Sequence, residues 1–193
     1  MSFSELYQLV QKQAAPISSK WIEEQALKLS RITKVKEQWS SVVDMMNLRG
    51  FYLEGPLGPP VTLADNQSLI VLSRSMCVGP QGPYWRRFVK TKELMHVFDT
   101  DDECADSEER FDLQIEKFSD PAAPMSPQYR AETKAYYRAL AVLCPEAERL
   151  SYRGQLQRNE IGPEVVATAF RIPSNAIFEL MRDDFLERVD HSK

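Results

Sequence analysis

The sequence Arg-Phe-Val-Lys-Thr-Lys-Glu-Leu-Met-His, residues 87–96, decides most of what can be predicted about this chain. It follows a glycine-rich region with short β-type runs, and its apolar pattern predicts a helix from Tyr84 to Phe98. Lys92 and His96 are four residues apart, so their side chains are expected on one face of that helix. Glu93 directly follows Lys92, which concentrates three polar side chains within one and a half turns.

This spacing resembles that of a zinc-binding peptidase helix. In such a helix two histidines four residues apart hold the ion, and a glutamate after the first is the general base. Here the glutamate and the second histidine are present as Glu93 and His96, but the first position is Lys92. A protonated lysine cannot ligate a dication, and neutralising it beside a carboxylate is unfavourable. Glu-x-x-His alone is a weak pattern, because it arises by chance in many solvated helices.

Further segments strengthen the pattern. Residues 87–96 resemble the Arg-Phe-Thr-x-Ala-His-Glu-x-Gly-His signature of the ImmA/IrrE family of zinc peptidases. Residues 132–145, which begin Glu-Thr-Lys-Ala and end Leu-Cys-Pro, resemble the acidic helix of that family, and residues 165–177 resemble its closing helix-turn-helix-like element. The resemblance covers roughly residues 40–182 and implies a zincin-like fold whose third zinc ligand is a carboxylate from the acidic helix.

The resemblance assigns roles to individual positions. Glu93 matches the general base, and His96 and Glu132 match ligand positions, all three as vestiges of a site that has lost its ion. Lys134 lies near Glu132, where the family has two acidic residues, so the sequence leaves open which of the two positions supplies the third ligand.

The departures from the family pattern indicate whether the zinc ion of the family is retained. Lys92 replaces the first histidine, and Met95 replaces a glycine and adds bulk. The other histidine of the chain, His191, is remote in sequence, and the three cysteines have neither a CxxC nor a Cys/His zinc spacing. We therefore expect that the family's zinc has been lost and that no cofactor takes its place.

The order of elements predicts an α+β fold that is predominantly helical. Residues 51–53, 61–63 and 69–72 read as strands of a small antiparallel sheet packed against a zincin-like helical core. The predicted organisation is N-terminal helices over residues 1–47, a peptidase-like core over 48–160 and helix-turn-helix-like helices over 161–193, within one compact domain. A further helix is predicted from Ser107 to Phe118, and Ser174 is predicted to cap a last helix that runs through Phe185.

Composition excludes several functions. A net charge of −4 argues against a general binder of nucleic acids or anionic membranes, because phosphate binding needs an excess of lysine and arginine. Asp183 and Asp184 also place acid on the would-be recognition helix, where packing of Ile177, Phe178 and Met181 is the preferred interpretation. Unpatterned cysteines, with no signal peptide or membrane span, predict a cytoplasmic protein.

These observations lead to one preferred function and two alternatives. The preferred hypothesis is a pseudo-peptidase of bacterial or phage origin that binds a protein or peptide partner, and the resemblance points to a repressor-type regulator as that partner. The first alternative is an active zinc-dependent metallopeptidase with an atypical metal site. The second is an unrelated helical interaction module whose matches to the family are accidental.

Overall fold

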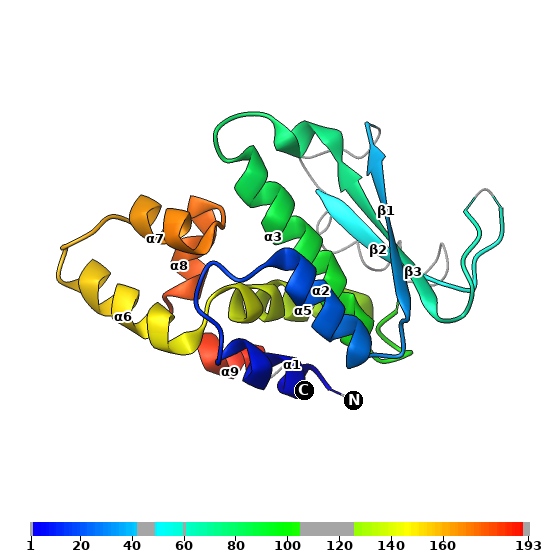
Figure 1. Cartoon of the computed structure of the whole chain (residues 1–193), viewed down its shortest axis with the longest axis horizontal. Coiled ribbons are helices and arrows are strands. Elements are labelled where there is room, and N and C mark those ends of the chain that lie inside the picture. The colour runs from blue at the N-terminus through cyan, green and yellow to red at the C-terminus, as the bar shows by residue number, and fades with distance from the viewer. Residues whose placement is uncertain (1, 42–48, 60, 105–125, 191–193) are drawn as a thin grey trace.

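The computed structural model describes residues 2–41, 49–59, 61–104 and 126–190, which form a mixed α+β structure. In Figure 1 the sheet lies on one side of α3, and α6, α7 and α8 lie on the other. The elements, in chain order, are α1 Phe3–Val10, α2 Ser19–Lys28, β1 Lys34–Ser40, β2 Gly50–Glu54, β3 Gln67–Ser73, η1 Arg74–Cys77, α3 Gly82–Leu94, η2 Met95–Phe98, α5 Pro127–Leu143, α6 Glu146–Gln157, α7 Pro163–Phe170, η3 Ser174–Ala176, α8 Ile177–Leu180 and α9 Phe185–Asp190.

The sheet is mixed, with strand order β1-β3-β2. β2 pairs antiparallel with β3, as predicted, but β1 pairs parallel with β3, so the prediction of an antiparallel sheet is only partly right. The predicted strand at 61–63 is wrong, because this segment contributes only an isolated bridge between Leu57 and Leu63. A single bridge closes the loop between β2 and β3 without adding a strand to the sheet.

β1 replaces a predicted helix. Val35 and Trp39 are four residues apart, a spacing that places two side chains on one face of a helix and equally on one face of a strand. The strand forms because Lys34 to Ser40 pair residue by residue with β3, and Val35 and Trp39 still pack against the core. The prediction that residues 1–47 are wholly helical is therefore wrong at β1, and residues 42–48 lie outside the described part of the chain.

β3 explains how the sheet is held between two apolar clusters. Its consecutive residues alternate sides, so Ile70 and Leu72 join the main hydrophobic core, whereas Leu69 and Val71 join a smaller cluster with Leu63. A run of four apolar residues is what a strand covered on both faces requires. The main core draws buried residues from Phe3 in α1 to Val189 in α9.

Helices α3 and α5 form the centre of the molecule. The Ser126 hydroxyl accepts a hydrogen bond from the Tyr129 amide at 3.0 Å and so caps α5, with Pro127 in its first turn. α5 is buried along most of its length and contacts α1, α3, η2 and α9, while α3 also contacts β2 and β3. β2 and β3 therefore pack beside the helix that the sequence predicts from Tyr84 to Phe98. That helix ends at Leu94, and its last turn tightens into η2.

The C-terminal region differs from the prediction. The last helix is broken into η3, α8 and α9, and Ser174 does not cap it. Instead, the Ser174 hydroxyl accepts a hydrogen bond from the Gln81 side chain at 2.8 Å, which ties this region to the start of α3. Ile177 is buried as predicted, but Phe178 is 75% exposed, so its predicted packing is wrong. The helix predicted from 107 to 118 lies outside the described residues.

Candidate functional site

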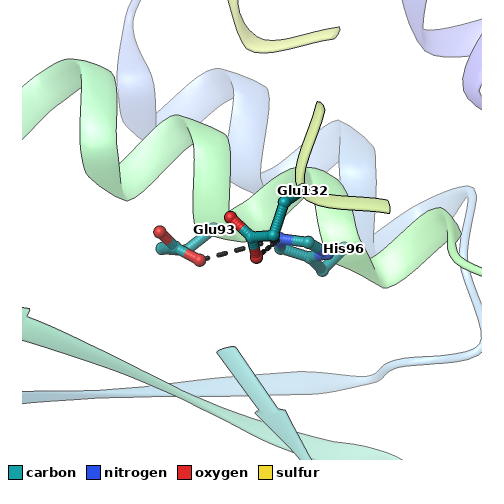
Figure 2. Close-up of side chains that lie close together, drawn as sticks. All are labelled: Glu93, His96 and Glu132. Carbon is teal, nitrogen blue, oxygen red and sulfur yellow. Dashed lines mark ion pairs between the residues drawn. The ribbon is translucent and has the colours of Figure 1, made fainter. Parts of the chain in front are cut away.

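Glu93, His96 and Glu132 meet at the junction of three elements. Glu93 is the penultimate residue of α3, His96 lies in η2, and Glu132 comes from α5 across the interface (Figure 2). His96 Nε2 is 3.0 Å from one Glu132 oxygen and 3.7 Å from Glu93 Oε2. One donor atom from each residue can be chosen so that all three lie within 4.8 Å of one another, and all three residues are buried. Segments 36 residues apart in the chain are thus joined by charged groups.

Lys92 completes this cluster. Its ammonium donates a hydrogen bond to Glu93 Oε1 at 3.0 Å and forms an ion pair with Glu132. The Lys92 side chain is only 14% exposed, so the two carboxylates replace most of its hydration. Lys92 and His96 therefore approach Glu132 together from the same chain segment.

The protonation of the cluster follows from mutual pairing. Burial alone would lower the pKa of Lys92, but Glu132 and Glu93 outweigh it and raise that pKa. Burial likewise opposes charge on Glu132, yet Lys92 and His96 lower its pKa to about 2. His96, desolvated but close to Asp99 and Glu132, has its pKa raised to about 10. Burial dominates at Glu93 and raises its pKa. At neutral pH the cluster therefore holds charged Lys92, His96 and Glu132.

Asp99 orients His96 from its other side. Its Oδ2 lies 2.6 Å from His96 Nδ1, and the i,i+3 spacing brings the two together at the end of η2. A carboxylate on the second ring nitrogen fixes the orientation of an imidazole. The motifs in the sequence did not mark Asp99. Its position three residues after His96 is the signal that would have identified it.

Lys134 belongs to the Asp99 side of the cluster. Its ammonium is 3.3 Å from Asp99 Oδ1 and pairs with Glu103. Arg138, one turn further along α5, lies 3.8 Å from the same Asp99 oxygen. Residues two apart on a helix do not share a face, so Glu132 and Lys134 point to different partners. Of the two positions that the sequence left open, Glu132 faces His96, whereas Lys134 faces Asp99 and Glu103.

Tyr52 of β2 covers the imidazole. The rings of Tyr52 and His96 stack with their centroids 5.6 Å apart, and the Tyr52 hydroxyl donates to Glu54 at 3.1 Å. The sheet thus packs a ring against one face of the His96 imidazole. No sequence motif indicated this contact, since it depends on how β2 packs on η2.

A pocket of about 490 Å³ opens beside the Lys92–Glu132 pair. Its walls come from α3, α5, the start of β2 and the η3–α8 region. The lining residues are Arg49, Gly50, Trp85, Phe88, Val89, Lys92, Glu93, Glu132, Thr133, Tyr136, Tyr137, Asn175, Ala176 and Glu179. Met95, which adds bulk to this helix, is fully buried in the core and does not line the pocket.

The donor set fits a zinc ion poorly as it stands. Glu93, His96 and Glu132 offer an N/O set of the type zinc accepts, and Glu93 Oε2 accepts no hydrogen bond within the described residues. However, the Lys92 ammonium already pairs with Glu132, and a dication placed among these ligands would be repelled by it. Binding a metal would require Lys92 to leave the cluster or lose its proton.

Comparison with models of known protein families, with curated proteins and with solved structures finds no match for this chain. The ImmA/IrrE resemblance is carried by the sequence motifs alone. Across the described ranges, no helix has the length and apolar character needed to cross a bilayer.

Proposed function

We propose that this protein is a non-catalytic ImmA/IrrE-like pseudo-peptidase, a regulatory protein of bacterial or phage origin that binds a protein or peptide partner. The observation that carries the proposal is the position of Lys92, whose ammonium pairs with Glu132 and donates to Glu93 beside His96. In the family these positions surround a zinc ion. In this chain the Lys92 ammonium lies among them instead.

A lysine in this place has a structural effect and no Lewis acidity. Its charge balances Glu132 and joins α3 to α5, as an ion at the same junction would. It cannot, however, coordinate a water oxygen and lower the pKa of that water, which is the step by which zinc produces a nucleophile. The scaffold and its adjoining pocket then remain suited to binding rather than hydrolysis.

The second candidate is a metallopeptidase with an atypical metal site. The closeness of Glu93, His96 and Glu132 favours it, because three donor atoms of suitable type already converge. In this function Lys92 would have to swing out when the ion binds. An unrelated interaction module has less support, because it gives no reason for His96 to meet Glu132, the residue that the ImmA/IrrE resemblance matches to a ligand position.

Zinc titration by calorimetry separates these functions. Wild-type protein purified without added zinc is compared with Lys92→His and with Lys90→His. Lys90→His is the matched control, because Lys90 is on the same helix but pairs with Glu23 and Glu37. We expect wild type and Lys90→His to bind zinc weakly, and Lys92→His to gain affinity that is lost again in Lys92→His/Glu132→Gln. One equivalent bound tightly by the wild type and lost in His96→Ala would overturn the proposal in favour of the metallopeptidase.

The partner is approached with the same variants. Affinity capture with wild-type protein, followed by mass spectrometry, should identify a bound protein whose retention does not depend on added zinc or chelator. A partner that is cleaved during the incubation, with cleavage blocked by chelator, would contradict a purely binding role.

A further inference from the structure

The pocket beside the Lys92–Glu132 pair contains a cation that no described carboxylate neutralises. The guanidinium carbon of Arg49 lies 3.5 Å from the centroid of the Trp85 ring. Within the described ranges, Arg49 forms no side-chain ion pair or hydrogen bond, and burial lowers its pKa without an opposing acid. A partly buried arginine stacked on one face of a ring keeps its in-plane N–H groups free for a ligand.

The position of Arg49 is held by its backbone. Its carbonyl accepts a hydrogen bond from the Ser73 amide at 2.9 Å. The next residue, Gly50, is so closely packed that a Cβ there would lie 2.9 Å from Val89 Cγ1 and 3.0 Å from the Val71 carbonyl oxygen. The chain is therefore clamped between α3 and β3 at the point where Arg49 enters the pocket.

Aromatic side chains form one wall of the pocket. Trp85 and Phe88 meet edge to face at 6.4 Å, Phe88 and Tyr136 at 5.3 Å, and Tyr136 and Tyr137 at 5.5 Å between centroids. This wall joins α3 to α5 and continues from the ring on which Arg49 stacks. A volume of about 490 Å³ can hold a ring and a short chain.

The acids of the pocket already have donors. Glu132 and Glu93 are paired with Lys92, and Glu179 accepts a hydrogen bond from the Tyr137 hydroxyl at 2.7 Å. Within the described ranges, by contrast, the guanidinium of Arg49 has no carboxylate partner. An arginine fork that is partly desolvated binds a carboxylate through two parallel hydrogen bonds.

We propose that this pocket binds a carboxylate on an apolar, ring-bearing body, with the carboxylate on the in-plane N–H groups of Arg49 and the ring against Trp85, Phe88 and Tyr136. The inference deepens the proposed binding role and rests on it only for the origin of the ligand. The C-terminal residue of a peptide has this chemistry, and so does a small arylalkanoic acid.

The test uses the full-length chain and calorimetric titration with three probes: acetyl-glycyl-phenylalanine, its C-terminal amide and 3-phenylpropanoate. The free acid should bind at least about tenfold more tightly than the amide, the loss expected for one charge-assisted pair. Binding by the peptide acid alone assigns the site to a chain terminus, and binding by phenylpropanoate alone assigns it to a small acid. Either result supports the proposal.

Variants locate the contact. Arg49→Met keeps an apolar side chain over Trp85 and should weaken acid binding about tenfold to a hundredfold. Arg86→Met is the matched control, because Arg86 stacks on Trp39 at 4.9 Å outside the pocket, and it should bind like wild type. Equal binding of acid and amide, no binding of any probe, or unchanged binding by folded Arg49→Met would overturn the proposal. The acid-to-amide comparison stands on wild type alone if Arg49→Met does not fold.

This experiment involves no zinc. Tight zinc binding by wild type would overturn the proposed function and leave the carboxylate pocket intact, whereas failure of the acid probes would remove the pocket proposal and leave the zinc result unaffected.

Discussion

Replacing Lys92 with methionine removes the charge at the centre of the buried cluster and keeps most of the side-chain volume. Glu132, 5% exposed, would keep its ion pair with His96, and Glu93 Oε1 would lose the ammonium that donates to it. Removing one partner of a buried pair leaves the other charge uncompensated and typically costs about 3–5 kcal/mol. We expect Lys92→Met to lower the free energy of unfolding by an amount in this range.

Urea unfolding followed by circular dichroism measures the effect, with the free energy extrapolated linearly to water. Lys90→Met is the matched control. Lys90 lies two residues before Lys92 on the same helix, and its side chain is 26% exposed. It pairs with Glu23 and Glu37, which are also partly exposed, so its replacement should lower the free energy of unfolding by about 0–1 kcal/mol. The two substitutions make the same chemical change in the same helix.

A double variant separates the ion pair from other effects of the substitution. Lys92→Met/Glu132→Gln removes both charges, so it should be more stable than the sum of the single losses predicts, by about 0.5–3 kcal/mol. A cost of Lys92→Met no larger than that of Lys90→Met, or strict additivity in the double variant, would refute the reasoning that the Lys92–Glu132 pair balances the site.

The remaining predictions address pH, nucleic acid and packing. Folding raises the pKa of His96 from 6.5 to about 10, so the stabilisation from its charge is complete below pH 6.5 and is lost as the pH rises toward 10. Urea unfolding at a series of pH values should show that the wild type loses stability over this window and that His96→Gln loses less. Asp183 on the would-be recognition element pairs with Arg153, so fluorescence anisotropy should find no salt-sensitive binding of duplex DNA, and sub-micromolar binding that weakens steeply with salt would contradict this. Phe178→Ser should change the free energy of unfolding by within about 0.5 kcal/mol, whereas Ile177→Ala should lower it by about 2–5 kcal/mol, and equal effects would refute the observed orientation of α8.

Local signals predicted several elements well. Pro127 and Pro163 stand in the first turns of α5 and α7, where a missing N–H costs nothing, and both helices form there. β2 and β3 were recognised from short β-type runs between turn residues. β1 was missed because its apolar spacing suits either a helix or a strand, and only the ladder to β3 makes the choice.

The candidate site also has one part that the sequence predicted and another that it could not. The spacing of Lys92, Glu93 and His96 already predicts that they lie together, since neighbours along one helical segment meet whatever the rest of the chain does. The partner across the interface could be narrowed to Glu132 or Lys134 but not chosen, because the choice depends on the rotation of α5 about its axis. That rotation is set by the packing of α5 on several elements at once.

The sequence by itself determined the chemistry of this protein's central helix, which carries a lysine, a glutamate and a histidine at fixed spacing. Only the tertiary structure decided that Glu132 pairs with Lys92, and that Asp99 and Tyr52 contact the imidazole of His96. It also decided that Arg49 lies in an aromatic pocket, where it has no carboxylate partner within the described residues. The physical reason is the distance along the chain over which each kind of contact acts. Helical spacing acts over a few residues, whereas these contacts join segments that meet only when the core buries their apolar faces.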